Sequence, residues 1–458
     1  MLNFTKFERI NPEKRDVLLR LKDFNEVYEV FGQQRGKEQA DRCMQCGDPY
    51  CHTGCPLHNY IPAWLKQTAT KNLDFAFALS NETSPFPEIL GRICPQDSLC
   101  EGACSLNTGH GAVSIGAVET HINETAFEMG MKPRFSSVKN GKKVAVIGSG
   151  PSGIAAATFL LRKGFEVEMF EREDRAGGLL TYGIPGFKLD KNTVTRRIDW
   201  LLEAGMKLHL NTEVGKDISI KEIEDKFDSI YLGIGATAGN YPGLDGEKSS
   251  NVHLAMNFLT GIQKRNFGKK PENFIDVTGK RVVVIGGGDT AMDCVRSSVR
   301  EGASSVKCLY RRDEANMPGS KKEVVNAKEE GVEFVFNVSP KSFKTQGDLA
   351  TAVELQTTSM SEPDESGRQK VVINEGSEYL EEADIIILAL GFKPAVPGFL
   401  KELNVEVNSW GGIVKDINFR TSNTKVFAGG DCVRGADLAV TAAADGRDCA
   451  RKMIEFIG

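Results

Sequence analysis

The run of residues 142–171 constrains the fold more than any other part of the chain. The β-branched residues of 143–147 predict a short buried strand, and glycines follow it in the order Gly148-x-Gly150-x-x-Gly153. Residues 154–162 have a helical pattern, and 166–170 predict a second strand. A strand, a glycine turn, a helix and a strand in this order predict a βαβ unit of a parallel sheet.

The glycine turn in this unit predicts a dinucleotide site. Gly148 permits the tight turn, Gly150 lets a pyrophosphate approach the backbone, and Gly153 lets the helix pack close to the strand. Glu171 follows the second strand, where a carboxylate can accept hydrogen bonds from a ribose. The pyrophosphate would bind at the free N–H groups of the helix start, which consists of Pro151, Ser152, Gly153 and Ile154.

A second unit of the same kind begins further along the chain. A strand at 280–285 leads into a second turn, and the next strand, 306–310, ends at Arg311-Arg312 where the first unit has an acid. Two guanidinium groups suit a 2′-phosphate, so NADPH is favoured over NADH. The alternative is a solvated charged loop; Lys321 and Lys322 could add charge to the same phosphate. The residues expected at this turn are Gly286, Gly288, Asp289, Thr290 and Ala291.

Two further segments should complete the first site. The glycine-rich segment 175–188 is too long for a simple connection and is expected to line a cofactor. Near the end of the chain, Asp431 follows a strand and Gly430, and the residues after it, 436–457, predict a helix. An aspartate there can bind the ribityl chain of a flavin. We therefore expect two Rossmann-like domains, one inserted in the other.

Seven of the eleven cysteines lie between residues 43 and 104. Zinc and iron–sulfur clusters are the alternatives, because a reducing cytoplasm disfavours disulfides. The first group, which ends at Cys55-Pro56, has the spacing typical of bacterial ferredoxins, and the second group has no CxxC pair for a zinc knuckle. Two four-iron clusters need eight ligands. The eighth could come from an oxygen or nitrogen atom of His52, His58, His110 or Glu119.

Helical apolar spacing at 14–31 and 73–79 predicts a small α-helical domain around these cysteines. The expected domains are thus 1–140 with the clusters, 141–272 together with 389–458 for FAD, and 273–388 for NADPH. The fold class is α/β with an α-helical domain in front.

The whole chain resembles the small (β) subunits of bacterial NADPH-dependent glutamate synthase. The segments that carry the resemblance are CMQCGDPYCHTGCP, ICPQDSLCEGAC, RRDEANMPGSKKEV and AGGDCVRGADLAVTAAADGR. The architecture is also similar to the N-terminal part of dihydropyrimidine dehydrogenase. The resemblance implies FAD, NADPH and two 4Fe-4S clusters, with Glu119 as the eighth ligand.

The resemblance also implies which residues bind each group. Cys43, Cys46, Cys51 and Cys104 would hold one cluster, and Cys55, Cys94, Cys100 and Glu119 the other. FAD would contact the first turn, Glu171, Gly177, Gly178, Leu179, Lys188, Gly430 and Asp431, and NADPH the second turn with Arg311 and Arg312. No general acid or base is expected, because the redox chemistry belongs to the cofactors.

Composition excludes several classes of function. The net charge is −5 and the pI is about 5.9, so no basic surface for nucleic acid is expected. Residues 144–161 carry no charge until Arg162, but their glycines and Pro151 would break a membrane helix. The charged N-terminus lacks the apolar segment of a signal peptide, and a cytoplasmic protein is expected.

The resemblance implies an electron-input subunit. It would oxidise NADPH and pass electrons through FAD and the clusters to a large (α) subunit that forms glutamate from glutamine and 2-oxoglutarate. Three alternatives stay open: a related oxidoreductase that serves ferredoxin or a pyrimidine reductase, a disulfide reductase, and a non-catalytic scaffold. A disulfide reductase needs a redox CxxC beside the flavin, and the only CxxC is Cys43 to Cys46.

Overall fold

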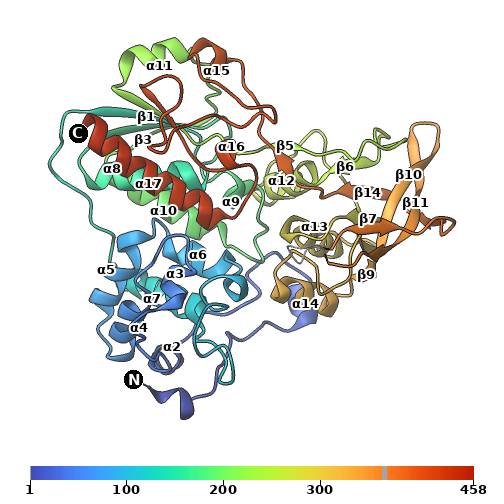
Figure 1. Ribbon diagram of the computed structural model, residues 1–458, viewed down its shortest axis with the longest axis horizontal. Helices are drawn as coiled ribbons and strands as arrows, with labels where there is room; N and C mark the ends of the chain where they lie inside the picture. The colour runs from blue at the N-terminus through green and yellow to red at the C-terminus, as the bar shows by residue number, and fades with distance from the viewer. Residues whose placement is uncertain (1, 364–368) are drawn as a thin grey trace.

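The computed structural model describes residues 2–363 and 369–458 (Figure 1). In Figure 1 a helical domain at the N-terminus, here called the cysteine domain, lies below the outer α/β unit, and the inserted α/β unit projects to the right. The outer unit contains residues 141–239 and 392–458, and the inserted unit contains 240–391. No helix in the described part of the chain is both long enough and apolar enough to cross a membrane.

The cysteine domain is built from short helices around one apolar core. That core contains Trp64, which is fully buried, together with Ile115 and Val118 of the longest helix, and several of the cysteines pack against it. The helices are α2 (Gln33–Asp41), α3 (Tyr50–Thr53), α4 (Ile61–Ala69), α5 (Leu73–Thr83), α6 (Pro87–Ile93) and α7 (Ile115–Glu128). The helix expected at 73–79 is confirmed by α5.

The helix expected over 14–31 is wrong. Only α1 (Val17–Arg20) is helical there, and Lys14 forms an isolated antiparallel bridge with Tyr28. The apolar residues of this segment contact other parts of the molecule. Phe24, for example, packs against the core of the inserted unit, and the backbone N–H of Val27 donates to the carbonyl of Phe187 in the outer unit (3.0 Å).

The outer unit is a parallel sheet with strand order β16-β4-β1-β2-β3. The strands are β1 (Lys143–Ile147), β2 (Glu166–Phe170), β3 (Lys207–His209), β4 (Ser229–Leu232) and β16 (Val426–Ala428). Its helices are α8 (Pro151–Arg162), α9 (Leu179–Tyr182), α10 (Lys191–Glu203), α11 (Ile220–Lys226), α15 (Phe399–Glu402), α16 (Asp431–Arg434) and α17 (Ala439–Ile457). Helix α17 packs against α8 (Figure 1), so the last helix of the chain lies beside the helix that follows the first glycine turn.

The inserted unit repeats this plan, with parallel strand order β6-β14-β7-β8-β9. Its strands are β6 (Val252–Leu254), β7 (Arg281–Ile285), β8 (Ser305–Tyr310), β9 (Glu333–Phe336) and β14 (Ile385–Leu388), and its helices are α12 (Ala255–Asn266), α13 (Asp289–Arg300) and α14 (Lys321–Glu329). An antiparallel sheet of β10 (Val338–Gln346), β11 (Leu349–Met360), β12 (Val371–Ile373) and β13 (Tyr379–Glu382) projects from one end (Figure 1).

The expected start of the inserted domain at residue 273 is too late. Strand β6 pairs with β14, and α12 packs into the core of the inserted unit, so both belong to it. The chain crosses between the units at β5 (Ala238–Gly239) and β15 (Phe392–Lys393), which pair antiparallel. The sequence of β6 is short and has no glycine turn after it, so it gave no signal of a new domain.

Buried ion pairs join the three parts. Glu88 of α6 and Arg197 of α10 are both almost fully buried, and the Arg197 Nε donates to Glu88 Oε1 (2.7 Å). Arg20, from the N-terminal segment, donates through Nε to Glu330 Oε1 of the inserted unit (3.0 Å), and Arg296 binds the same carboxylate. Because an unpaired buried charge is costly, these pairs strongly favour one arrangement of the three parts.

Replacement of Glu88 by alanine should therefore destabilise the protein severely. Arg197 would stay buried without its carboxylate, and the expected loss in free energy of unfolding is about 3–5 kcal/mol. Urea unfolding followed by circular dichroism measures it. Glu455→Ala, which breaks the exposed pair with Lys452, is the control and should cost less than about 1 kcal/mol. Equal losses in the two variants would contradict the role of the buried pair.

Candidate functional site

Four cysteines from three separate segments line one small cavity in the cysteine domain. They are Cys43, Cys46, Cys51 and Cys104, and the walls include Leu65, Leu106 and Ile115. Burial, followed by the nearby Cys43 and Cys104, raises the pKa of Cys51 to about 12. Gln45 Nε2 lies 3.2 Å from Cys43 Sγ, in position to donate to it. A cation in this cavity would reverse the effect on the thiol pKa values, because it favours thiolates.

A second cavity contains Cys55, Cys94, Cys100 and Glu119. The Glu119 carboxyl is buried, accepts a hydrogen bond from Asn59 Nδ2 (2.8 Å), and has a pKa raised to about 8, mainly by burial and then by Glu88. Burial also raises the pKa values of Cys94 and Cys100 well above the usual value, and the charge of Glu119 adds to the effect in both. Three thiols and a carboxyl group gathered in one buried cavity are a donor set that the positive charge of an iron–sulfur cluster's iron atoms would compensate.

The spacing of the donor atoms in both cavities does not match a site for a single zinc ion. Among the described residues, no three cysteine, histidine, aspartate or glutamate side chains converge closely enough to hold one metal ion. A zinc site would bring four ligands to about 2.0–2.3 Å from one point. Four donors spread around a cavity suit a cluster, in which each sulfur binds a different iron atom.

The first nucleotide turn has the form that a pyrophosphate requires. Gly148 has φ +96°, and a Cβ on it would lie 2.4 Å from the carbonyl oxygen of Gly233. At Gly150 a Cβ would meet nothing within 4 Å, so the space above the turn is open. Helix α8 begins directly after it, with Pro151 in its first turn and no side chain capping its N–H groups.

Glu171 lies at the end of β2, as expected, and is held by Ser149 from the turn. The Ser149 backbone N–H donates to Glu171 Oε2 (3.1 Å), and the Ser149 hydroxyl donates to the same oxygen. The Ser149 oxygen also accepts from the N–H of Gly177 (3.0 Å), so one hydroxyl joins the turn, the acid and the glycine loop. Sequence reasoning missed Ser149, which occupies a variable position of the glycine motif.

The glycine loop and the C-terminal acid approach this turn from two other sides. A Cβ on Gly178 would lie 2.8 Å from the Cα of Gly150, so the segment that leads into Leu179 packs closely against one side of the turn. Gly430 has φ +78°, and its N–H donates to Asp445 Oδ2 (2.9 Å). Asp431 Oδ1 is buried and, within the described residues, has no hydrogen-bond partner. An unpartnered buried carboxylate oxygen fits the hydroxyl donors of a ribityl chain.

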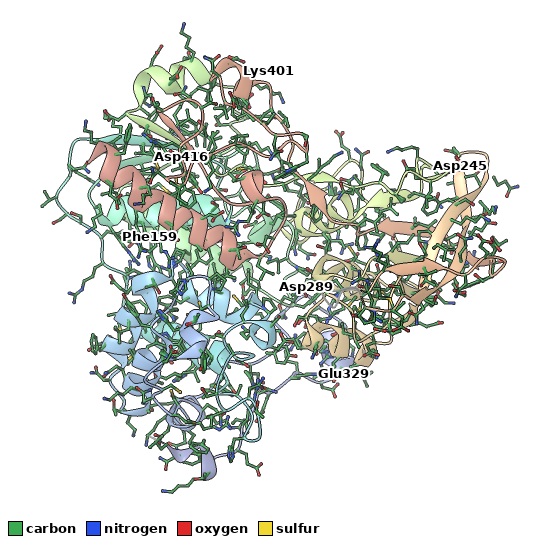
Figure 2. All side chains as sticks on the ribbon, viewed as in Figure 1. Phe159, Asp245, Asp289, Glu329, Lys401 and Asp416 are labelled. Carbon is green, nitrogen blue, oxygen red and sulfur yellow. The ribbon has the colours of Figure 1, made fainter. Side chains whose placement is uncertain are left out.

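The second nucleotide turn has the same design. Gly286 has φ +149°, a Cβ on Gly288 would meet nothing within 4 Å, and Ala291 is fully buried under the helix start. Helix α13 begins at Asp289 and Thr290 without a side-chain cap. Asp289 lies near the centre of the molecule in Figure 2, and its Oδ1 accepts from the N–H of Ser320 (3.2 Å).

Arg311 and Arg312 follow β8 with their backbones held and their side chains available. The carbonyl of Arg311 accepts from Thr358 Oγ1 (2.9 Å), and that of Arg312 accepts from the N–H of Asn337 (3.1 Å). Arg311 is exposed, and Arg312 Nε is buried with no partner in the described part of the chain. These side chains fit a 2′-phosphate.

Lys322 does not lie with these arginines, contrary to expectation. Its Nζ donates to the carbonyl of Arg92 (3.2 Å) and to Gln96 Oε1 (3.3 Å), both in the cysteine domain. Lys321 lines a cavity on the same side. The loop 311–320 turns back to the Gly287 carbonyl through the N–H of Gly319 (3.0 Å), and so α14 starts close to the cysteine domain.

Lys188 lies between the two units. Its Nζ is 2.9 Å from Asp293 Oδ1 and 4.0 Å from Asp289 Oδ1, both on α13. Burial alone would lower the pKa of Lys188, but Asp293, Glu323 and Asp289 outweigh it and raise that pKa. Burial raises the pKa of Asp293 to about 6. The sequence did not indicate a role for Asp293, because this residue lies at an ordinary position of an amphipathic helix.

The second cysteine cavity is in direct contact with the outer unit. Val440, in the first turn of α17, lines the same cavity as Cys55, Cys94, Cys100 and Glu119. Helix α17 begins shortly after Asp431 and covers α8. Asp431 and the second cysteine cavity are thus linked by one short stretch of chain.

The remaining cysteines do not form a redox pair. Cys294, Cys308, Cys432 and Cys449 are all buried and free, and burial raises the pKa of each thiol. Cys43 and Cys46 lie in the cysteine domain with Cys51 and Cys104, away from the nucleotide turns. The arrangement therefore disfavours a disulfide reductase.

Comparison with known proteins agrees with these features. Residues 20–131 match a family model described as dihydropyrimidine dehydrogenase domain II, 4Fe-4S cluster, and residues 142–446 match the pyridine nucleotide-disulphide oxidoreductase model. The glutamate synthase [NADPH] small chain of Escherichia coli K12 is 48% identical, over 99% of this chain and 98% of its own length. That of Azospirillum brasilense is 46% identical, over 98% of this chain and 95% of its own.

The chain belongs to the family of glutamate synthase [NADPH] small chains. Nearly the whole chain also matches part of a longer protein of Escherichia coli K12, the putative oxidoreductase AegA. The two are 45% identical over 98% of this chain and 70% of AegA. Among solved structures, FprA of Mycobacterium tuberculosis in complex with NADPH has a TM-score of 0.59 at 18% identity, covering 69% of this chain and 84% of FprA. This likeness confirms the expected fold class for the two α/β units.

The burial of Asp431 predicts that the stability of the flavin-free protein depends on pH. Burial, more than the neighbouring Asp437, raises the pKa of Asp431 to about 7. An acid whose pKa is raised in the folded state costs nothing below the unfolded value, near 4, and destabilises progressively as pH rises to 7. We expect Asp431→Asn to stabilise the flavin-free protein by about 1–3 kcal/mol at pH 8 and very little at pH 4.5. Thermal unfolding at both values measures this, and an equal effect at both would contradict it.

Proposed function

We propose that the chain is the electron-input subunit of an NADPH-dependent glutamate synthase. It would oxidise NADPH and deliver electrons to a separate large subunit that forms L-glutamate from L-glutamine and 2-oxoglutarate. When bound, FAD supplies hydride acceptance, and two 4Fe-4S clusters supply single-electron transfer. The names of the relatives support the activity and the large-subunit partner, and a cytoplasmic location would follow.

Each part of the chain has a positioning role in this proposal. The α8 turn and Glu171 would bind the FAD pyrophosphate and ribose, with Gly177, Gly178 and Leu179 over them and Asp431 accepting from the ribityl hydroxyls. The α13 turn would bind the NADPH pyrophosphate, and Arg311 and Arg312 its 2′-phosphate. The two cysteine cavities would each hold one cluster, with Glu119 as the eighth ligand.

The observation that carries the proposal is the wall shared by α17 and the second cysteine cavity. Val440, in the first turn of α17, lines the cavity that contains Glu119, and α17 follows Asp431 closely in the chain. A flavin oriented by Asp431 would therefore lie close to the second cluster. The cavity of Cys43, Cys46, Cys51 and Cys104 is lined, among the described residues, by the cysteine domain alone, and it would be the later one on the route.

Anaerobic reduction of the purified protein tests the entry of electrons. We expect NADPH to bleach the flavin absorbance much faster than NADH, because the two arginines suit the 2′-phosphate that only NADPH carries. Metal analysis of the same sample should find iron and sulfide in place of zinc. A colourless folded protein would favour the scaffold, and a zinc-loaded one would remove the electron route.

Arg311→Ala and Arg312→Ala should each raise the KM for NADPH by about 10- to 100-fold, with kcat little changed. Each removes a charge-assisted hydrogen bond worth about 1.5–3 kcal/mol. The KM for NADH serves as the internal control and should not change, because NADH lacks the phosphate. A parallel rise for both coenzymes would show that the arginines support the fold and not the phosphate.

Glu119→Gln tests the eighth ligand. A carboxylate places a negative charge on the second cluster, which a neutral amide does not, and so the variant should have a higher midpoint potential for one cluster. An electron paramagnetic resonance titration measures both clusters in one sample. The other cluster is the control; an unchanged midpoint for both would reject Glu119 as a ligand.

One observation favours a second candidate. AegA, a putative oxidoreductase, matches nearly the whole chain at an identity close to that of the small chains. A related oxidoreductase that serves a different acceptor is therefore the alternative. Addition of a purified glutamate synthase large subunit distinguishes the two: glutamate formation driven by NADPH supports the first, and its absence with an intact complex supports the second.

A further inference from the structure

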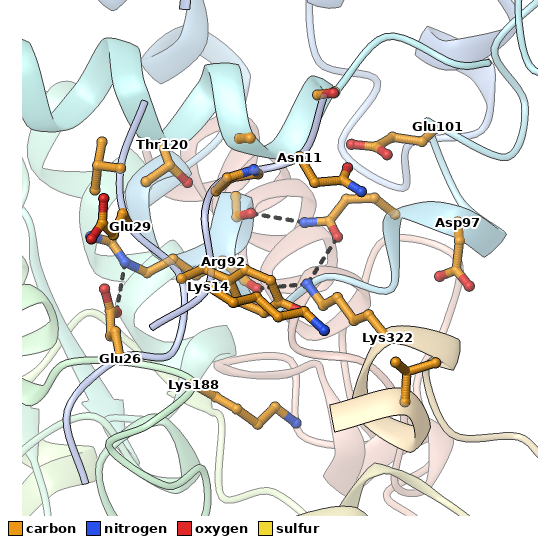
Figure 3. A pocket seen from close by; sticks show the side chains of 18 of the residues that line it. Asn11, Lys14, Glu26, Glu29, Arg92, Asp97, Glu101, Thr120, Lys188 and Lys322 are labelled. Carbon is orange, nitrogen blue, oxygen red and sulfur yellow. Dashed lines mark hydrogen bonds and ion pairs between the residues drawn. The ribbon is translucent and has the colours of Figure 1, made fainter. Parts of the chain in front are cut away.

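A cavity of about 470 Å³ lies where the cysteine domain, the outer unit and the inserted unit meet (Figure 3). Its walls come from the N-terminal segment and α6, from Phe187 and Lys188 of the outer unit, and from Lys321, Lys322 and Val325 of α14. The volume is in the range of small-molecule sites. Its lining residues include none of the cysteines or nucleotide-turn glycines.

Most charged side chains in the wall already have partners. Arg92 binds Glu26 (2.7 Å), Lys14 binds Glu329 (2.8 Å), Lys188 binds Asp293 (2.9 Å), and Arg9 binds Glu101 (2.5 Å). Lys321 and Lys322 are different: in the described part of the chain, neither has a carboxylate within 4.0 Å. Among the described residues, the hydrogen bonds of Lys322 Nζ go to the neutral oxygens of Arg92 and Gln96, as the dashed lines in Figure 3 show, and its charge acts on Glu101 and Glu323 from a longer distance.

The positions of these two lysines conflict with local helix stability. They are the first two residues of α14, and Ser320 before them makes no side-chain cap. Positive charge at a helix N-terminus opposes the helix dipole, and Glu323 in the same turn offsets this only in part. Such conflicts between sequence and local structure are expected at functional sites, where a ligand can compensate them. A bound anion would offset both the dipole and the unpaired ammonium groups.

We propose that this cavity binds a small organic dicarboxylate. One carboxylate would pair with Lys322 and the other with Lys321, and the carbon chain between them would contact the side chain of Val325. Two carboxylates match two unpaired cations, and a carbon skeleton makes better use of apolar walls than an inorganic anion does.

Two acidic side chains in the cavity wall suggest that the ligand also carries a positive charge. Glu29 and Asp97 also line the cavity, and in the described residues neither forms a side-chain ion pair. A dicarboxylate that also carries an ammonium group could pair with one of them, so an acidic amino acid should bind at least as tightly as a plain dicarboxylate. Because the ligand would contact residues of two different parts of the molecule, binding should also raise the Tm of the protein.

Isothermal titration calorimetry of the cofactor-loaded protein tests the site. The probes are succinate, L-glutamate and inorganic phosphate, each added at constant ionic strength with sodium chloride as the blank. We expect saturable binding of succinate and L-glutamate and weaker binding of phosphate. Lys321→Met combined with Lys322→Met should weaken dicarboxylate binding at least tenfold.

Two further variants keep the test independent of folding. Lys328→Met removes the same charge from the same helix, but Lys328 pairs with Glu314 and does not line the cavity, so binding should be unchanged. Val325→Glu adds a negative charge at a half-exposed position of the wall and leaves both lysines in place. It should also weaken dicarboxylate binding at least tenfold.

Each outcome of these titrations either supports or overturns the proposed site. Loss of binding in the double variant and in Val325→Glu, with retention in Lys328→Met, supports the site. Absence of saturable binding, or equal binding in all variants, overturns it, and tighter binding of phosphate than of both dicarboxylates overturns the class of ligand. The titrations contain no NADPH, so a failure here is distinct from a failure of the electron route, which flavin reduction tests.

Discussion

Buried ion pairs hold the cysteine domain, the outer unit and the inserted unit in one arrangement. Glu88 of the cysteine domain and Arg197 of the outer unit are both almost fully buried, as are Arg20 and the Glu330 of the inserted unit that it binds. Such pairs add little net stability compared with apolar residues of the same size. They do penalise any other docking, because a misplaced part would leave a charge buried and alone. The distance between the cysteine cavities and the nucleotide turns depends on this docking.

In the cysteine domain, the residues that would bind metal clusters are also part of the folded core. Its helices are short, and its core around Trp64 is completed by the cysteines themselves. Burial raises the pKa values of Cys51, Cys100 and Glu119, and nearby thiol or carboxyl groups add to the effect. Metal binding would release those protons and replace repulsion by attraction, so that the free energy of cluster binding contributes to the folding of the domain.

Local features of the fold could be predicted from the sequence, and features that depend on distant contacts could not. Both nucleotide turns, Glu171 and Asp431 lie as expected, because each is specified by a strand and the few residues after it. Spacing alone left the grouping of Cys104 with Cys43 open, and the resemblance to a family supplied it. The helix predicted over 14–31 was wrong, because the apolar residues of this segment contact the outer and inserted units and do not form one face of a helix. Lys322 was misplaced for a similar reason: its partners lie far from it in sequence.

Lys188 shows how the two nucleotide sites depend on each other. Asp289 and Asp293 lie in the first turns of α13, where acids suit the helix dipole but would repel a pyrophosphate at the same helix start. Lys188 lies between α9 and α10 of the outer unit, and its ammonium group offsets this repulsion from the other side of the junction. The second turn therefore reaches an electrostatic state suited to an anion only when the inserted unit is docked on the outer unit. Under the proposed function, a nicotinamide would reach a flavin only in that docking, so Lys188 would link coenzyme binding to the geometry that hydride transfer needs.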